Sequence, residues 1–247
     1  NVATYIDVYQ NIRELYENQK AAAERTLTKK SFSFNVPGGR CEVCHGAGTV
    51  DAGLPFLEGM QSICPSCGGQ RFKDEVLEVT YQNKNIAQVL KMTGKEAMEF
   101  FKSISKVERK LKVLCEIGLG YLPLGIMLNT LSGGECQRLR LAKELIKKKR
   151  GHILYVFDEP TTGLHPQDVR AIMRMFGRLV DSGNSLIIIE HNMSVISQAD
   201  YIIDLGPQGG EKGGNLLYEG PLPGLLDVMG SATGGCLKAY IDPSWKG

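Results

Sequence analysis

The sequence predicts an α/β fold in which a mostly parallel sheet has helices on its flanks. Two continuous apolar runs, 153–157 and 186–189, have the composition of strands buried on both faces of a parallel sheet. Between them, apolar residues recur at helical spacing, so the three segments form a strand–helix–strand unit. A third observation, two closely spaced cysteine pairs before residue 70, predicts a smaller module inserted ahead of the sheet.

Length and composition exclude several classes of protein. A chain of 247 residues with 43% hydrophobic content is able to bury one sizeable core and a smaller module. No apolar stretch approaches the roughly 20 residues of a membrane span, and the first residues do not form a secretory signal. The net charge of +2 argues neither for nor against a nucleic-acid partner, and the basic run 147–150 suits a helix C-terminus. We expect a cytoplasmic protein without a membrane partner.

The four paired cysteines predict a zinc site. Cys41 and Cys44 form one pair, Cys64 and Cys67 the other, in the spacing C-x2-C-x19-C-x2-C. Each pair places two thiolates on one tight turn, and the gap fits a tetrahedral zinc site. Disulfides are the alternative, which the absence of a secretory signal disfavours. His45 is a weaker candidate, because four cysteines already complete the coordination sphere. We therefore expect a zinc ribbon.

The segments around the cysteine pairs carry their own patterns. Apolar residues alternate over 31–36 and over 76–81, which predicts a strand on each side of the zinc module. Helical spacing over 86–101 and again over 107–115 predicts a helical subdomain after it.

The run Leu131–Gln137, LSGGECQ, predicts the start of a helix. Ser132 is a favourable N-cap, and Glu135 three residues later completes a capping box. The amide groups exposed at such a helix start suit a phosphate, and Gly133 and Gly134 allow the close backbone approach that a phosphate requires. An ordinary capped helix is the alternative interpretation of this run alone.

Polar residues follow both apolar strands. Asp158 and Glu159 stand at the carboxyl end of the first strand, the edge where open α/β sheets bind ligands. Two carboxylates at that edge suit one magnesium contact and one general base for water, although capping carboxylates are the structural alternative. His191 follows the second strand, where an imidazole is placed to hydrogen-bond a terminal phosphate.

These motifs together resemble a known superfamily. The patterns L-S-G-G-E-x-Q, D-E-P-T-T-G-L-H after an apolar strand, and I-I-E-H resemble the ATP-binding-cassette (ABC) ATPases. With F-N-V-x-G-G-R-C-E-x-C before them and D-L-G-P-Q-G-G after them, the chain is similar over nearly its whole length to the UvrA family of the bacterial excinuclease. The resemblance implies a partial ABC ATPase core with an inserted zinc ribbon and a helical signature subdomain.

The resemblance also implies a domain order. Residues 1–30 are expected to form the helical start of the cassette insertion, 31–80 the zinc-binding module and 81–127 the helical signature subdomain. Residues 128–247 are expected to form the ATPase subdomain with signature, Walker B segment, D-loop and H-loop.

The motifs carry functional roles over to this sequence. The resemblance implies that Asp158 holds Mg²⁺ through water, that Glu159 polarises the attacking water, and that His191 senses the γ-phosphate. The remaining cofactor-binding residues are expected to contact a nucleotide held by a partner cassette or to couple the two sites; they are Ser132, Gly133, Gly134 and Gln137 of the signature, and Gly163 of the D-loop.

The implied function is damage recognition in bacterial nucleotide excision repair, the excinuclease pathway of the SOS response. ATP binding and hydrolysis are expected to gate engagement of damaged double-stranded DNA and loading of UvrB, in a homodimer that binds Zn²⁺, ATP and Mg²⁺. The sequence contains no G-x-x-x-x-G-K-[ST] phosphate loop (Walker A). We therefore expect a fragment of the second cassette of a longer polypeptide, inactive as an ATPase by itself.

Three other interpretations remain. A UvrA-like paralogue fits the departures from the family pattern, which are the segments 49–58 and 126–129 together with Cys136 and Val2. A zinc-dependent DNA- or protein-binding module with a structural ATPase remnant fits the missing phosphate loop. A transporter cassette is disfavoured, because transporter cassettes carry no zinc insert.

Overall fold

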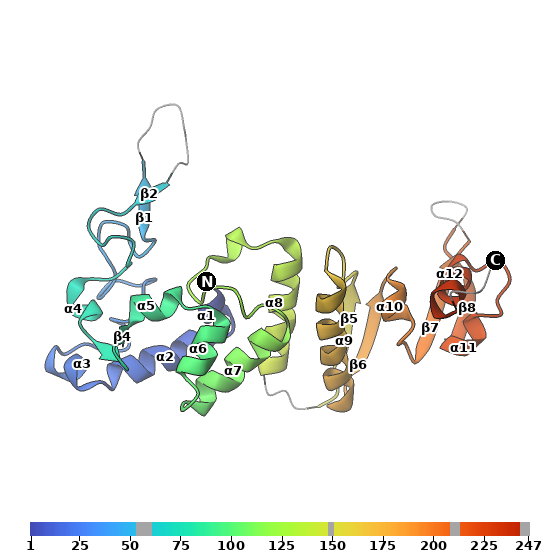
Figure 1. Ribbon diagram of the computed structural model, residues 1–247, viewed down its shortest axis with the longest axis horizontal. Helices are drawn as coiled ribbons and strands as arrows, with labels where there is room; N and C mark the ends of the chain where they lie inside the picture. Colours follow the sequence, from blue (N-terminus) through green and yellow to red (C-terminus); the bar gives the residue numbers. More distant parts are fainter. Residues whose placement is uncertain (53–60, 148–150, 208–212, 243–247) are drawn as a thin grey trace. The chain divides into compact units, whose positions relative to one another are not determined.

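The computed structural model describes residues 1–52, 61–147, 151–207 and 213–242. Contacts between residues divide the chain into two compact units, 1–149 and 150–247, and each is described by itself. Figure 1 shows a first unit that is mainly helical with small hairpins, and a second that combines strand pairs with helices. The predicted mixed α/β character is confirmed. The basic residues 148–150, residues 53–58 between the cysteine pairs and residues 208–210 of the D-L-G-P-Q-G-G run lie outside the described residues.

The first unit is built mostly from short helices. They are α1 (Val2–Tyr5), α2 (Val8–Glu17), α3 (Lys20–Glu24), α4 (Asp74–Leu77), α5 (Ile86–Lys91), α6 (Gly94–Phe100), α7 (Ser105–Glu116) and α8 (Gly133–Ile146), with a 3-10 turn η1 (Leu128–Thr130) before α8. Two antiparallel hairpins complete it, and they are β1 (Thr49–Asp51) with β2 (Gln61–Ile63), and β3 (Thr80–Tyr81) with β4 (Lys84–Asn85).

Aromatic residues of α2 and of the loop after α3 form part of the buried core of this unit. The rings of Tyr9 and Phe34 are 5.3 Å apart between centroids, and those of Tyr16 and Phe32 are 5.8 Å apart. Burial raises the pKa of both tyrosines, and each buried hydroxyl has a partner. Tyr9 donates to the Phe32 carbonyl at 2.7 Å, and Tyr16 donates to the Lys84 carbonyl at 2.6 Å. Both tyrosine hydroxyls are therefore satisfied although they are buried.

Of the two strands predicted beside the zinc module, 31–36 is wrong and 76–81 is right only at its end. Residues 31–36 form turns. Phe32 and Phe34 are buried as the pattern suggested, but Ser33 between them is buried too. The Phe32 carbonyl accepts a hydrogen bond from the Tyr9 hydroxyl, so it is not paired with a neighbouring strand. In 76–81 the first two residues belong to α4, and only Thr80–Tyr81 form a strand. Local alternation here reflected single aromatic and aliphatic anchors rather than a sheet.

The helical predictions are confirmed with one refinement. The segment 86–101 forms two helices, because Thr93 and Glu96 make a capping box that starts α6, and two residues separate it from the end of α5. The segment 107–115 lies within α7. The helix predicted after Ser132 is α8, and its capping box with Glu135 is present.

The second unit carries the predicted strand–helix–strand motif. Its elements are β5 (Leu154–Asp158), α9 (Pro166–Asp181), β6 (Ser185–Ile189), α10 (Met193–Ile196), β7 (Tyr201–Gly206), β8 (Asn215–Pro221), α11 (Leu222–Leu225) and α12 (Ala232–Ile241). Strands β5 and β6 are parallel, with Leu154 opposite Ser185 and Asp158 opposite Ile189. Strands β7 and β8 form an antiparallel pair.

The parallel pair is covered on one face in the described residues. Phe157 of β5 packs against Phe176 of α9, with ring centroids 4.9 Å apart. On the opposite face Leu154 and Val156 are 54% and 62% exposed. The prediction that these strands are buried on both faces is wrong here. Helix α9 covers one face, and a parallel strand is buried on both faces only where a second layer covers the other face as well.

The part of the unit after α10 has a small core with one buried carboxylate. Ile202, Leu225 and Leu237 pack together, and the nearby Asp204 is buried. Asp204 accepts hydrogen bonds from Ser231 Oγ at 2.6 Å and from Thr233 Oγ1 at 2.8 Å, so the start of α12 is tied to β7. No helix in the described ranges is long and apolar enough to cross a membrane.

Ser231→Ala tests how this tie stabilises α12. Ser231 Oγ donates to Asp204 and also accepts from the Gly234 amide at 2.8 Å as the N-cap of α12. The substitution removes both bonds, so the free energy of opening α12 is expected to fall by about 1–3 kcal/mol. Hydrogen exchange of peptides covering 232–241 measures the change. Ser182→Ala, at the exposed C-cap of α9, is the control, and unchanged exchange in Ser231→Ala contradicts the prediction.

Candidate metal centre and nucleotide-site residues

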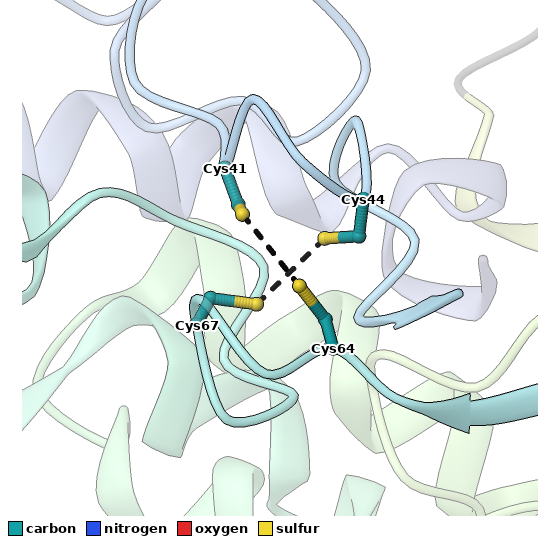
Figure 2. A group of neighbouring side chains, drawn as sticks. All are labelled: Cys41, Cys44, Cys64 and Cys67. Atoms are coloured by element: carbon teal, nitrogen blue, oxygen red, sulfur yellow. Dashed lines mark hydrogen bonds between the residues drawn. The ribbon is translucent and has the colours of Figure 1, made fainter. Parts of the chain in front are cut away.

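Four buried cysteines converge on one point. Their sulfur atoms all lie within 4.8 Å of one another, and Figure 2 shows the side chains of Cys41, Cys44, Cys64 and Cys67 pointing toward a common centre. The distance is 3.9 Å between the sulfurs of Cys41 and Cys64, and 3.7 Å between those of Cys44 and Cys67. A tetrahedral zinc ion with Zn–S bonds of about 2.3 Å separates its sulfurs by about 3.8 Å. The predicted ligand set therefore fits zinc.

The loops after each cysteine pair aim backbone amides at sulfur. Gly48 N–H donates to Cys44 Sγ at 3.3 Å, and Arg71 N–H donates to Cys67 Sγ at 3.4 Å. Gly46 and Gly48 have φ of 86° and 84°, which a residue with a side chain adopts only at a cost. His45 is exposed, and the metal-binding group found among the described residues consists of the four cysteines without it.

The sulfurs need a cation to ionise together. Burial opposes ionisation of Cys41, but hydrogen bonds from the backbone N–H groups of Cys44 and Val43 outweigh it and lower its pKa to about 6. At Cys67 burial and the neighbouring sulfurs raise the pKa to about 12. A bound divalent cation supplies the positive charge that lets all four groups act as thiolates.

Arg71 connects the cysteine module to the helical part of the first unit. Its carbonyl accepts from Cys41 N–H at 2.8 Å, its Nη1 donates to the Gly125 carbonyl at 3.1 Å, and its guanidinium lies 5.6 Å from the centre of the Phe34 ring. Gly125 in turn donates to the Leu90 carbonyl at 2.7 Å. Sequence reasoning missed Arg71, because nothing local marks an arginine as the link between two modules.

The signature residues surround the start of α8. Ser132 Oγ accepts from Glu135 N–H at 3.3 Å, and the Glu135 carboxylate accepts from Ser132 N–H at 2.7 Å. Ser132 and Gly133 are exposed, while Gly134 and Gln137 are half-buried. A Cβ added to Gly133 meets no atom within 4 Å, so there is open space beside its Cα. The geometry suits an anion that approaches along the helix axis.

Glu159 and His191 meet at the carboxyl ends of β5 and β6. The His191 Nε2 atom lies 3.3 Å from Glu159 Oε1, and Thr162 Oγ1 donates to Glu159 Oε2 at 3.0 Å. Glu159 has a left-handed backbone, φ 42°, and its N–H donates to the Ile189 carbonyl at 2.9 Å. Asp158 immediately before it ends β5 and is exposed. The structure therefore brings together the two residues predicted to be catalytic.

Glu190 is a site residue that the sequence did not single out. Its Oε1 accepts from Thr161 N–H at 2.8 Å and from Thr161 Oγ1 at 2.5 Å. Its Oε2 accepts from the N–H groups of His191 and Asn192 at 3.0 and 3.2 Å. One carboxylate thus ties the loop that contains Gly163, which has φ 71°, to the segment that carries His191. The acidic residue at a strand end was visible in the sequence, but its partners were not.

Curated relatives align with almost the whole length of this chain. No protein-family model matches it. UvrABC system protein A of Lactiplantibacillus plantarum is 48% identical over 242 residues, which are 98% of this chain and 25% of that protein. The protein of the same name from Methanothermobacter thermautotrophicus is 49% identical over 241 residues, with the same shares. The chain is homologous to UvrA. It spans about a quarter of the length of these curated relatives.

A solved structure extends the UvrA likeness to the fold. The crystal structure of UvrA2 from Deinococcus radiodurans matches with a TM-score of 0.89 and 45% identity, over 97% of this chain and 29% of that one. The predicted fold class, a partial ABC-type α/β region of UvrA with a four-cysteine module, is confirmed. The predicted division at residues 30, 80 and 127 stays a prediction; contacts group the signature helix α8 with the first unit.

Metal analysis tests the cysteine centre. We expect about one zinc ion per chain, since the four thiolates complete one tetrahedral shell. Cys64→Ser is expected to lose the metal and the ordered turns around it, because binding energy of such sites is folding energy. Elemental analysis of the purified proteins gives the zinc content. Cys236→Ser, at an exposed cysteine outside the cluster, is the control and is expected to keep its zinc; zinc retained in Cys64→Ser contradicts the assignment.

Glu190→Gln tests the tie between the two loops. The amide keeps the size of the side chain but replaces one acceptor oxygen by a donor, so two of the four hydrogen bonds are lost. We expect the free energy of opening these loops to fall by about 1–3 kcal/mol, measured by hydrogen exchange over 159–164 and 190–193. Glu219→Gln on the exposed edge of β8 is the matched control. Equal exchange in both variants contradicts this role.

Proposed function

We propose that the chain is part of a UvrA-type damage-recognition ATPase of bacterial nucleotide excision repair. In this proposal ATP binding and hydrolysis gate the engagement of damaged double-stranded DNA and the loading of UvrB. The observation that supports it best is homology over 98% of the chain, in a chain whose Glu159 and His191 meet at the carboxyl ends of two parallel strands. The parent protein is a cytoplasmic homodimer with two cassettes in each polypeptide.

The residues at the strand ends divide the hydrolysis between them. Asp158 would hold Mg²⁺ through water, and the ion would neutralise phosphate charge when it is bound. Glu159 accepts a proton from the water that attacks the γ-phosphate, and the products are ADP and phosphate. His191 donates a hydrogen bond to the γ-phosphate. Glu159 and His191 lie within contact distance, and Glu190 accepts hydrogen bonds from both loops.

The signature residues serve a second nucleotide. Ser132, Gly133, Gly134 and Gln137 lie at the start of α8, where amide groups and the helix dipole favour an anion. In the proposal they close over ATP held by the other cassette, and Gly163 lies in the loop that couples the two sites. Since this sequence contains no phosphate loop, the chain by itself is expected to hydrolyse no ATP.

The zinc module has a structural role in the proposal. Four thiolates hold Zn²⁺ and order the turns that carry the two cysteine pairs, and Arg71 links that module to the segment before the signature. A change of the module on contact with DNA is thereby transmitted toward the nucleotide site.

Two other functions remain as alternatives. A UvrA-like paralogue is supported by the similar identity to UvrA2, 45%, and to the UvrA relatives, 48% and 49%. A zinc-dependent DNA- or protein-binding module with a structural ATPase remnant predicts binding that is independent of nucleotide. Complementation of a strain that lacks UvrA separates the first alternative from the proposal, and nucleotide-dependent DNA binding by the full-length protein excludes the second.

Glu159→Gln tests the ATPase role in a full-length UvrA-type protein that carries this chain. The other cassette carries the corresponding Glu→Gln change, so that the remaining turnover belongs to this site. We expect ATP binding to persist and hydrolysis to fall about a hundredfold or more, because the base is lost while the fold is kept. Steady-state phosphate release and nucleotide binding measure the two effects. Glu99→Gln, on exposed α6, is the control. Undiminished hydrolysis in Glu159→Gln refutes the assignment.

A further inference from the structure

We propose that Tyr121 is a positioning residue for the nucleotide-binding signature and acts through the carboxylate of Glu135. The inference rests on the proposed function, in which the start of α8 receives the phosphates of ATP. The Tyr121 hydroxyl donates a hydrogen bond to Glu135 Oε1, while Glu135 Oε2 accepts from Ser132 N–H at 2.7 Å. Both carboxylate oxygens therefore have donors, and the carboxylate has one fixed orientation.

The backbone holds Tyr121 at this place. Gly120 on one side accepts from Lys95 N–H at 2.8 Å, and Leu122 on the other accepts from Gly94 N–H at 2.9 Å. Leu119 and Leu122 are buried, so the segment is anchored in the core of the first unit. The Tyr121 side chain itself is 56% exposed. A tyrosine on a rigid segment with a largely exposed ring contributes mainly through its hydroxyl.

The negative charge of Glu135 lies close to the proposed phosphate site, and the Tyr121 hydrogen bond fixes its position. A capping-box glutamate is favourable at a helix N-terminus, but the same N-terminus is the proposed site for an anionic phosphate. A carboxylate that swings over the amides of Gly133 and Gly134 repels that phosphate and competes for the same donors. Tyr121 holds the carboxylate back on Ser132. The Tyr121 hydrogen bond is also the largest influence that holds the pKa of Glu135 below its ordinary value.

A double-mutant cycle in the full-length protein tests the inference. Tyr121→Phe is expected to raise the KM for ATP about three- to tenfold, the effect of one lost hydrogen bond, with kcat nearly unchanged. Glu135→Ala is expected to change the KM as well. In the Glu135→Ala background Tyr121→Phe is expected to have no further effect, because its partner is gone.

Tyr81→Phe is the matched control for these kinetics. The Tyr81 hydroxyl lies 3.5 Å from Ser103 Oγ, away from α8, and its removal is expected to leave the KM unchanged. A thermal melt of each variant shows whether the fold is kept. A purely structural role of Tyr121 lowers the melting temperature without the non-additivity between Tyr121 and Glu135.

Hydrogen exchange of the nucleotide-free protein gives a second readout that needs no ATPase activity. Tyr121→Phe is expected to increase exchange of the amides of 132–136 severalfold, since the capping box loses its support, whereas Tyr81→Phe leaves it unchanged. Unchanged exchange in Tyr121→Phe, or effects on KM that multiply in the double variant, overturn the inference. If Glu159→Gln fails to stall turnover, the proposed function falls, but the exchange result still decides whether Tyr121 positions Glu135.

Discussion

The constraint on which much of the first unit depends is the convergence of four cysteine sulfur atoms around one point. In the described residues the buried cluster of the module consists of the four cysteines, with Val50 packed against it, so a group of sulfur atoms with the geometry of a zinc site takes the place of a hydrocarbon core. Arg71 contacts one ligand sulfur through its amide and Gly125 through its guanidinium, and Gly125 lies on the segment that leads to α8. The position of that segment is thus tied to the four-cysteine site.

In the second unit the Glu190 carboxylate connects separate segments in a similar way. Glu190 collects four hydrogen bonds from two loops that are about thirty residues apart in sequence, and the buried Thr161 is one of its donors. Glu159, beside that loop, has an unusual left-handed backbone, which costs about 1 kcal/mol or more and persists only where its surroundings hold it. The ordered loops around Glu190 provide such surroundings.

The residues predicted well are those whose partners lie close in sequence or repeat with a fixed period. The capping box of Ser132 and Glu135, the parallel strands and the cysteine cluster belong to this group. The alternation of apolar residues over 31–36 led to a wrong strand prediction, because two buried phenylalanines have the same spacing in a turn as in a strand. Arg71 and Glu190 act through contacts across 54 and 29 residues, for which no local pattern exists.

The open face of β5 and β6 has a consequence for how this polypeptide behaves in solution. Leu154, Val156, Ile187 and Ile189 are all about half exposed or more, and they alternate along two adjacent strands. Such an exposed apolar face binds other apolar surfaces, including those of a second copy of the chain or of a fluorescent dye such as ANS. Salts that strengthen hydrophobic association, such as sulfate, promote clustering of the isolated chain, and mild detergent reverses it. Self-association through this face then limits the concentration of the isolated chain.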